Sequence, residues 1–119
     1  MDRTFTLEQA RTLLEELRPD LERIVDIRAD LANLARDHNA GMDVVVADIK
    51  ALEARMSQLL DQLGPRGVDV KGYAPLLLDF PVHHDGEVVL ACWLENEPAL
   101  AWYHDATVGF MGRRRFDDA

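Results

Sequence analysis

The residues best suited to chemistry lie in the last third of the chain. Trp102, His104 and Asp105 follow one another closely, and a Gly-Phe-Met-Gly motif leads into Arg113. A histidine titrates near neutral pH and can transfer protons when a carboxylate orients it. The candidate cluster, functional or structural, comprises Asp79, Cys92, Trp93, Glu97, Trp102, His104, Asp105 and Arg113.

An acid–base enzyme would pair His104 with Glu97 or Asp79. The strand register set by the expected turns places His104 opposite Val89 and several residues along the sheet from Glu97. We therefore do not expect these two side chains to touch, and we favour a structural histidine bonded to the backbone or to a carboxylate. No catalytic residue is assigned.

A metal site needs three or four ligands that converge on one point. His83 and His84 lie beside an expected strand turn, and His38 lies beside an expected helical turn. The single cysteine, Cys92, lies in the middle of an apolar strand, where burial keeps a thiol protonated and unreactive. The sequence thus predicts no bound metal, no other cofactor and no nucleophilic cysteine.

The segment from Gly109 to Arg113 could cradle an anion. It lacks the strand–loop–helix context and the lysine of a phosphate-binding loop, however, so we expect the glycines to allow a sharp turn. Phe110 then fills the core, and Arg113 pairs with an acid such as Glu97. The run of three arginines is soon followed by two aspartates, which predicts a solvated tail over 112–119 rather than a nucleic-acid patch.

The first half of the chain is expected to be helical. Thr6 and Gln9 have the spacing of a capping box, in which each side chain accepts a hydrogen bond from the other's backbone N–H. Apolar residues recur at steps of three and four over 7–38 and over 43–63, as in amphipathic helices. The Asn39-Ala40-Gly41 and Gly64-Pro65 breaks end these stretches. The pattern predicts a long antiparallel helical hairpin over 6–63.

The second half predicts a three-stranded antiparallel meander at 76–82, 87–94 and 99–104. Asp85-Gly86 is a strong signal for a two-residue turn between the first two strands. A short edge strand at 68–70 would also fit the pattern.

The turns set the register of these strands. The first turn pairs Leu78 with Trp93, and symmetric closure of the second turn pairs Ala91 with Trp102. Side chains alternate between the faces of a sheet, so His104 shares the face of both tryptophans. Asp79 and Cys92 then lie on the opposite face.

The two expected helices differ in length, so the first turns of the longer helix extend beyond the shorter one. Leu13, Leu14 and Leu17 lie there, before Pro19, and we expect the strands to cover them. The predicted fold class is α+β: a long antiparallel helical hairpin packed against a small three-stranded antiparallel β-meander. We expect one domain over 1–119, with the meander and C-terminal tail in 66–119.

Several stretches of the chain carry a family resemblance. They are Phe5-Thr6-Leu7-Glu8-Gln9-Ala10, Asp79-Phe80-Pro81, Gly86, Leu90-Ala91-Cys92-Trp93, Glu97-Pro98, Trp102-Tyr103-His104 and Gly109-Phe110-Met111-Gly112-Arg113. Together they resemble, over nearly the whole chain, a bacterial family known only as domain-of-unknown-function family 2203. Asn96 stands where the family usually has glycine, and asparagine can also adopt a positive φ. Glu15 replaces a proline that is common in the first helix. The resemblance implies no activity, since none is established for the family.

Composition excludes several classes of function. The formal net charge is −9, from 22 acidic and 13 basic residues. Such a charge repels phosphate backbones and anionic lipids, so we expect neither nucleic-acid nor membrane binding. The chain has one cysteine, no basic and apolar leader, and no apolar run near the roughly 20 residues that span a bilayer. The expected location is the cytoplasm.

Both faces of the expected sheet are apolar, which is more surface than one helical hairpin can cover. The leading interpretation is a non-enzymatic interaction module that self-associates as a dimer. An unidentified protein partner is a further expectation. The alternative is a small-ligand or metal-dependent enzyme centred on Glu97, His104 and Arg113.

Overall fold

The structure is a computed structural model that describes residues 3–39 and 45–117. The chain divides into two compact units. The sheet unit comprises residues 1–16 and 63–119, and the helical unit comprises residues 17–62. Helix α1 (Leu7–Asn39) contributes to both units.

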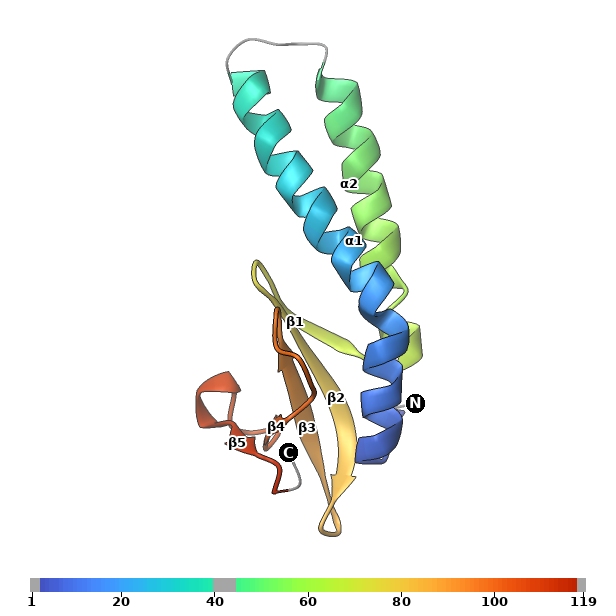
Figure 1. The fold of residues 1–119 in the computed structure, drawn as a ribbon, viewed down its shortest axis with the longest axis vertical. Coiled ribbons are helices and arrows are strands. Elements are labelled where there is room, and N and C mark those ends of the chain that lie inside the picture. Colours follow the sequence, from blue (N-terminus) through green and yellow to red (C-terminus); the bar gives the residue numbers. More distant parts are fainter. Residues whose placement is uncertain (1–2, 40–44, 118–119) are drawn as a thin grey trace. The chain divides into compact units, whose positions relative to one another are not determined.

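The predicted fold class is wrong. The described residues form one long helix of 33 residues, α1, and one shorter helix of 17 residues, α2 (Val45–Asp61). In place of a three-stranded meander it has a five-stranded antiparallel sheet with strand order β1-β2-β3-β4-β5 (Figure 1). The sequence pattern missed β5 and indicated only part of β1, because each outer strand is short and lacks a run of alternating apolar residues.

The strands are β1 (Asp69–Tyr73), β2 (Leu76–His84), β3 (Glu87–Leu94), β4 (Trp102–His104) and β5 (Arg114–Arg115). Two short 3-10 segments, Gly64–Arg66 and Phe110–Gly112, precede β1 and β5. The third predicted strand, 99–104, is reduced to three residues. β1 extends the edge strand that fitted the pattern at 68–70.

The β2–β3 hairpin forms as the sequence predicts. Asp85 and Gly86 make its turn, with φ values of 51° and 80°. Positive φ at both positions matches the twist of the flanking strands. The predicted pair Leu78–Trp93 is present, and Phe80 pairs with Ala91 in the same register.

The register between β3 and β4 differs from the prediction by one residue. Trp102 pairs with Cys92 rather than with Ala91, and His104 pairs with Leu90 rather than with Val89. A shift of one residue moves every side chain of a strand to the other face of the sheet. Trp102 and His104 therefore share a face with Asp79 and Cys92, opposite to Trp93.

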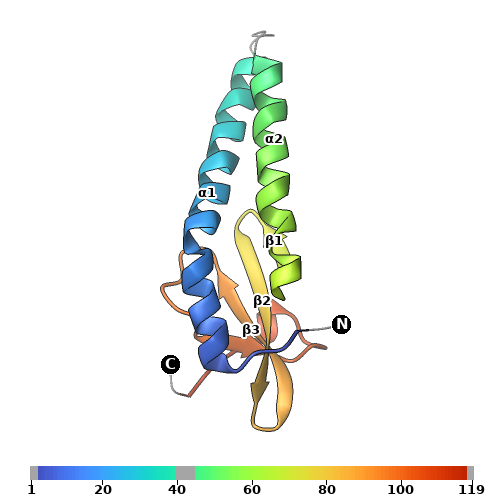
Figure 2. The ribbon, with the colours of Figure 1, turned by 90° about the vertical axis from the view of Figure 1, so that its right-hand side faces the viewer.

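The first turns of α1 belong to the sheet unit and run beside β2 (Figure 2). The predicted capping box is present: the Thr6 N–H donates to Gln9 Oε1 at 2.9 Å, and the Gln9 N–H donates to Thr6 Oγ1 at 3.0 Å. Phe5 bridges to Val82 in parallel, with its N–H 2.9 Å from the Pro81 carbonyl oxygen. The sheet unit buries Phe5, Ala10, Leu13, Leu14, Leu63, Val68, Leu76, Leu78, Phe80, Val82, Val89, Ala91, Cys92, Trp93, Leu100, Ala101 and Phe116.

The helical unit contains the rest of α1 and all of α2, which run side by side in opposite directions (Figures 1 and 2). Its buried side chains are Leu17, Leu21, Ile24, Ile27, Met56 and Leu59. Pro19 lies inside α1. Ala40 and Gly41 of the predicted turn lie outside the described residues. Among the described residues, no helix combines the length and the apolar character needed to cross a membrane.

The C-terminal residues do not form the solvated tail that was predicted. Arg114 and Arg115 pair with Tyr103 and Trp102, and the Phe116 N–H donates to the Ala101 carbonyl at 2.9 Å. Phe116 is 2% exposed, whereas Phe110 is only half-buried. The aromatic residue that fills the core is therefore Phe116, not Phe110 as predicted. Its ring lies 4.6 Å from that of Tyr103, while Arg114 and Arg115 remain exposed.

Candidate metal centre

Three polar side chains converge on one face of the sheet, and each comes from a different strand. Asp79 of β2 pairs directly with Cys92 of β3, and His104 of β4 pairs with Leu90, two residues from Cys92. One potential ligand atom from each side chain lies within 4.8 Å of the other two. All three residues are buried, with exposed fractions of 2% for Asp79, 0% for Cys92 and 5% for His104.

The imidazole of His104 is oriented from both sides. Its Nδ1 lies 2.8 Å from the backbone carbonyl oxygen of Asp105, and its Nε2 lies 3.2 Å from Asp79 Oδ1. A carbonyl oxygen only accepts hydrogen bonds, so Nδ1 carries a proton. Nε2 therefore faces a carboxylate oxygen, and one positive species, a proton or a metal ion, must lie between these two atoms.

The buried environment shifts the pKa of each group. Burial raises the pKa of Asp79, although His104 opposes the shift. Burial alone would lower the pKa of His104, but the Asp105 carbonyl and the Asp79 carboxylate outweigh it and raise that pKa. Burial also raises the pKa of the Cys92 thiol, against the effect of Arg113. Without a metal, the centre therefore holds a neutral thiol and one proton between Asp79 and His104.

Arg113 lies beside this centre in a tightly defined position. Its two terminal nitrogens donate to Glu97 Oε1 and Oε2 at 3.1 and 2.8 Å, which confirms the predicted pairing. The guanidinium carbon lies 4.6 Å from the ring centroid of Trp102 and 4.4 Å from that of Phe110. The Nη1 atom is also 3.8 Å from Cys92 Sγ. Arg113 therefore links the Glu97 turn to the cysteine.

Glu97 is held in place by the turn that it occupies. Its Oε1 accepts the Leu94 N–H at 2.7 Å, and its carbonyl oxygen accepts the indole N–H of Trp93 at 2.8 Å. Asn96 has a φ of 77°, the conformation that glycine adopts most readily. The carboxylate thus closes the turn and orients Arg113 at the same time.

The structure sorts the candidate residues into distinct roles. Asp79, Cys92 and His104 converge, and Glu97 and Arg113 form the neighbouring ion pair, with Trp102 against the guanidinium. Trp93 lies on the other face of the sheet and contributes only its indole N–H. Asp105 contributes its carbonyl oxygen, while its side chain is exposed.

Sequence reasoning missed the convergence for two reasons. The register error placed His104 on the wrong face, away from Asp79 and Cys92. The centre also combines a single histidine with a cysteine and a carboxylate, so the positions of the other histidines give no signal for it. A signal was available, because Asp79 and Cys92 follow correctly from the Asp85-Gly86 turn as a directly opposed pair.

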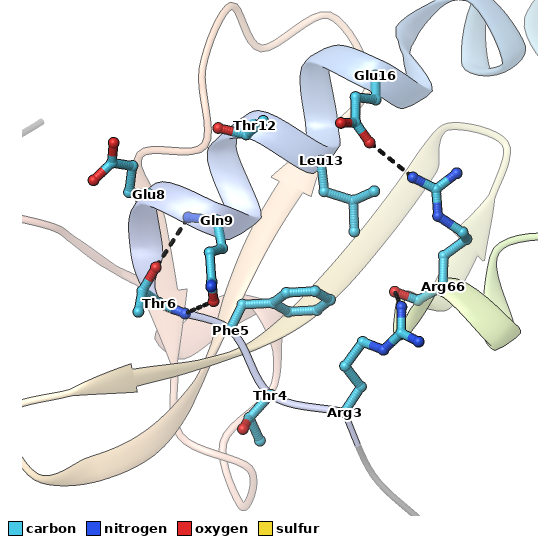
Figure 3. Close-up of a pocket in the computed structure, with 10 residues that line it drawn as sticks. All are labelled: Arg3, Thr4, Phe5, Thr6, Glu8, Gln9, Thr12, Leu13, Glu16 and Arg66. Atoms are coloured by element: carbon cyan, nitrogen blue, oxygen red, sulfur yellow. Dashed lines mark hydrogen bonds and ion pairs between the residues drawn. The ribbon is translucent and has the colours of Figure 1, made fainter.

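The sheet unit also contains an open cleft of about 630 Å³ near the start of α1 (Figure 3). Most of its polar side chains already have structural partners. Thr6 and Gln9 form the capping box, and Arg66 donates to Glu16 Oε2 at 2.8 Å. Arg3 donates to the Arg66 carbonyl oxygen at 3.4 Å. None of the candidate residues lines this cleft, so it is not part of the centre.

These features define an α+β protein whose five-stranded antiparallel sheet carries a buried Asp–Cys–His cluster beside an arginine–glutamate pair. The chain matches the uncharacterised conserved protein family DUF2203 over residues 3–116, and it belongs to that family. No curated protein and no solved structure matches the chain.

Proposed function

We propose that this protein binds one divalent transition-metal ion, with Zn²⁺ as the best fit, through Asp79, Cys92 and His104. The observation that carries the proposal is the convergence of the three ligand atoms within 4.8 Å of one another. The three ligands come from β2, β3 and β4, so they meet only when these strands pair in the sheet.

The distances suit a small, four-coordinate ion. Zinc bonds of about 2.0–2.3 Å at tetrahedral angles place neighbouring ligand atoms about 3.3–3.6 Å apart. His104 Nε2 and Asp79 Oδ1 are already 3.2 Å apart. The sulfur of Cys92 would need to move by at most about 1.2–1.5 Å, which a rotation about χ1 supplies at a modest cost in strain.

The donor set and the charges also fit. A thiolate, an imidazole and a carboxylate favour Zn²⁺ over Mg²⁺ or Ca²⁺, which prefer oxygen ligands. The charges of one aspartate and one thiolate cancel those of the ion, and Glu97 neutralises Arg113 separately. A hydrogen bond from Nδ1 to a backbone carbonyl is the usual support for a histidine that binds metal through Nε2.

Three protein ligands leave the fourth position of the ion to water, as in catalytic zinc sites, but the burial of all three ligands favours a structural metal. A catalytic zinc ion needs a position that substrate can reach. Here the most exposed ligand residue, His104, is 5% exposed. The alternative enzyme centred on Glu97, His104 and Arg113 is also less well supported, because Glu97 is fully engaged by Arg113 and by the Leu94 N–H.

Native mass spectrometry of the metal-free protein titrated with Zn²⁺ tests the proposal. We expect one ion per chain in the wild type, and loss of that ion in His104→Gln and Cys92→Ser. His83→Gln is the matched control, because His83 is exposed and its imidazole bonds to the Thr4 hydroxyl, outside the cluster. Circular dichroism checks that each variant folds.

A second readout uses Co²⁺ in place of Zn²⁺. Sulfur coordination gives a thiolate-to-cobalt charge-transfer band, which should be present in the wild type and absent in Cys92→Ser. Wild-type protein that binds no Zn²⁺, or a folded His104→Gln variant that binds it as tightly as the wild type, would overturn the proposal.

We also propose self-association as a second candidate function. The specific observation is the outer strand β1, which has no neighbour on one side in the described sheet and exposes 38% of Val70 and 44% of Tyr73. A second copy pairing along this edge would cover both side chains. Light scattering should then report a dimer that Val70→Lys dissociates, and a monomeric wild type would remove this candidate.

A further inference from the structure

The two sides of the metal centre are anchored in the sheet to very different degrees. Asp79 and Cys92 lie in the β2–β3 hairpin (residues 76–94), in which eight residues of each strand are paired. His104 lies in the C-terminal segment (residues 102–116), in which three residues pair with β3 and two pairs join β4 to β5. Few backbone hydrogen bonds therefore hold the segment to the hairpin.

Side chains provide the remaining links between the segment and the rest of the sheet. On one face, His104 bonds to Asp79, and Arg113 bonds to both Glu97 and Cys92. On the other face, the rings of Tyr103 and Phe116 lie 4.8 and 5.2 Å from that of His84. The side-chain hydrogen bonds to Asp79, Cys92 and Glu97 lie at the metal centre or next to it.

We propose that the metal ion fastens the C-terminal segment to the β2–β3 hairpin, so that metal occupancy controls whether the segment stays docked. This inference rests on the proposed function. Two ligands belong to the hairpin and one to the segment, so undocking of the segment removes a ligand and releases the ion. Any ion that binds only the docked form stabilises it by mass action.

Arg113 provides a second link that depends on the metal. Its Nη1 atom donates to Cys92 Sγ at 3.8 Å, the long distance of a weak bond to a neutral thiol. Metal binding converts the thiol to a thiolate, and hydrogen bonds to ionised acceptors are shorter and about twice as strong. Arg113 is therefore not a ligand but a positioning residue, whose hydrogen bond to Cys92 becomes stronger when the metal binds.

Hydrogen–deuterium exchange of the full chain, with and without Zn²⁺, tests the inference. In the metal-free protein, we expect the amides of the segment to exchange faster than those of the hairpin. With free Zn²⁺ at about 100 times the Kd, opening that releases the ion becomes about a hundredfold rarer. The exchange rates of the segment amides should fall by up to that factor and approach the rates of the hairpin amides.

Two matched arginine variants sharpen the test. Arg113→Met removes the bonds to Cys92 and Glu97 but keeps much of the apolar stem, and we expect Zn²⁺ affinity to fall by about 10–100-fold. Arg114→Met is the control, because Arg114 lies over the Tyr103 ring on the other face. The segment amides should exchange faster in Arg113→Met than in the wild type, and at the wild-type rate in Arg114→Met.

The outcomes separate the two proposals. If no Zn²⁺ binds, both the proposed function and this inference fail. If one ion binds but exchange of the segment does not change, the metal site stands and this inference alone is overturned. This inference alone is also overturned if, in the metal-free protein, the segment amides are already as protected from exchange as the hairpin amides.

Discussion

The β2–β3 hairpin and the C-terminal segment belong to one sheet, yet they are held in place by different interactions. The hairpin has a two-residue turn with a strong local preference and eight continuous residue pairs. The segment has short strands, and its position depends on Phe116, His104 and Arg113. The comparison shows that backbone pairing defines one region, whereas side chains from distant parts of the chain define the other.

The largest expected effect concerns the cores of the two regions. Phe80 of β2 is 0% exposed, and truncation of a buried phenylalanine costs about 3–5 kcal/mol. We expect Phe80→Ala to lower the free energy of unfolding by that amount, measured by urea denaturation with tryptophan fluorescence. Phe116→Ala should cost less, because the segment can open without unfolding of the hairpin.

Val88→Ala is the control for these core variants. Val88 lies in the same hairpin but is 50% exposed, so its truncation should change stability by about 0.5 kcal/mol or less. Equal losses in Phe80→Ala and Phe116→Ala would contradict the comparison, since they would show that both regions unfold as one unit.

An intermediate effect is expected for the ion pair that holds the segment. Glu97 and Arg113 have side-chain exposures of 18% and 16% and share two hydrogen bonds. Glu97→Gln should therefore cost about 2 kcal/mol of unfolding free energy, since hydrogen bonds to charged groups contribute about 1.5–3 kcal/mol.

Glu16→Gln is its matched control. Glu16 pairs with Arg66 at the same 2.8 Å distance, but the side-chain exposures are 57% and 46%. Exposed pairs contribute about 0–1 kcal/mol, so this change should be small and should shrink further in high salt. A Glu97→Gln variant as stable as Glu16→Gln would show that the pair does not anchor the segment.

The smallest expected effects concern the turns at the two ends of β3. Gly86 has a φ of 80°, and a Cβ there would meet no heavy atom within 4 Å, so Gly86→Ala introduces backbone strain alone, about 1 kcal/mol. Asn96→Ala should cost a similar amount for its φ of 77°, while Asn96→Gly should stay within about 0.5 kcal/mol of wild type. Thermal denaturation monitored by circular dichroism measures all three. A stabilised Asn96→Ala would refute the assignment of a strained conformation.

Local sequence signals predicted several elements of the fold, although the predicted fold class was wrong. The capping box at Thr6, the limits of α1 and the Asp85-Gly86 turn all follow from spacing over a few residues, and each is present. In these cases, the residues that determine the structure are close together in the sequence. The prediction therefore needed no knowledge of tertiary contacts.

The local sequence signals failed where contacts between residues distant in the sequence determine the structure. Symmetric closure of the 95–98 turn placed Trp102 one residue out of register, because the Glu97 side chain closes this turn by accepting the Leu94 N–H. The segment after His104 has no apolar alternation, so β5 could not be expected from pattern alone. Its pairing with β4 accompanies the inward placement of Phe116.

Several residues named from the sequence lie together in the structure, but the sequence placed His104 on the wrong face of the sheet. The Glu97–Arg113 pairing was predicted and is present. The partner of His104 is Asp79, one of the two carboxylates considered, and the third member is Cys92, which had been assigned an inert role. Its neighbours could be identified only once the register of β4 was known.

The bridge between Phe5 and Val82 has a consequence for how the chain folds as it is synthesised. Phe5 leaves the ribosome early, but its hydrogen-bonding partners at Pro81 and His83 are made much later. The intervening helices need only contacts close in sequence, which form quickly. We therefore expect the nascent protein to acquire helix first and to complete its sheet only after β2 has emerged.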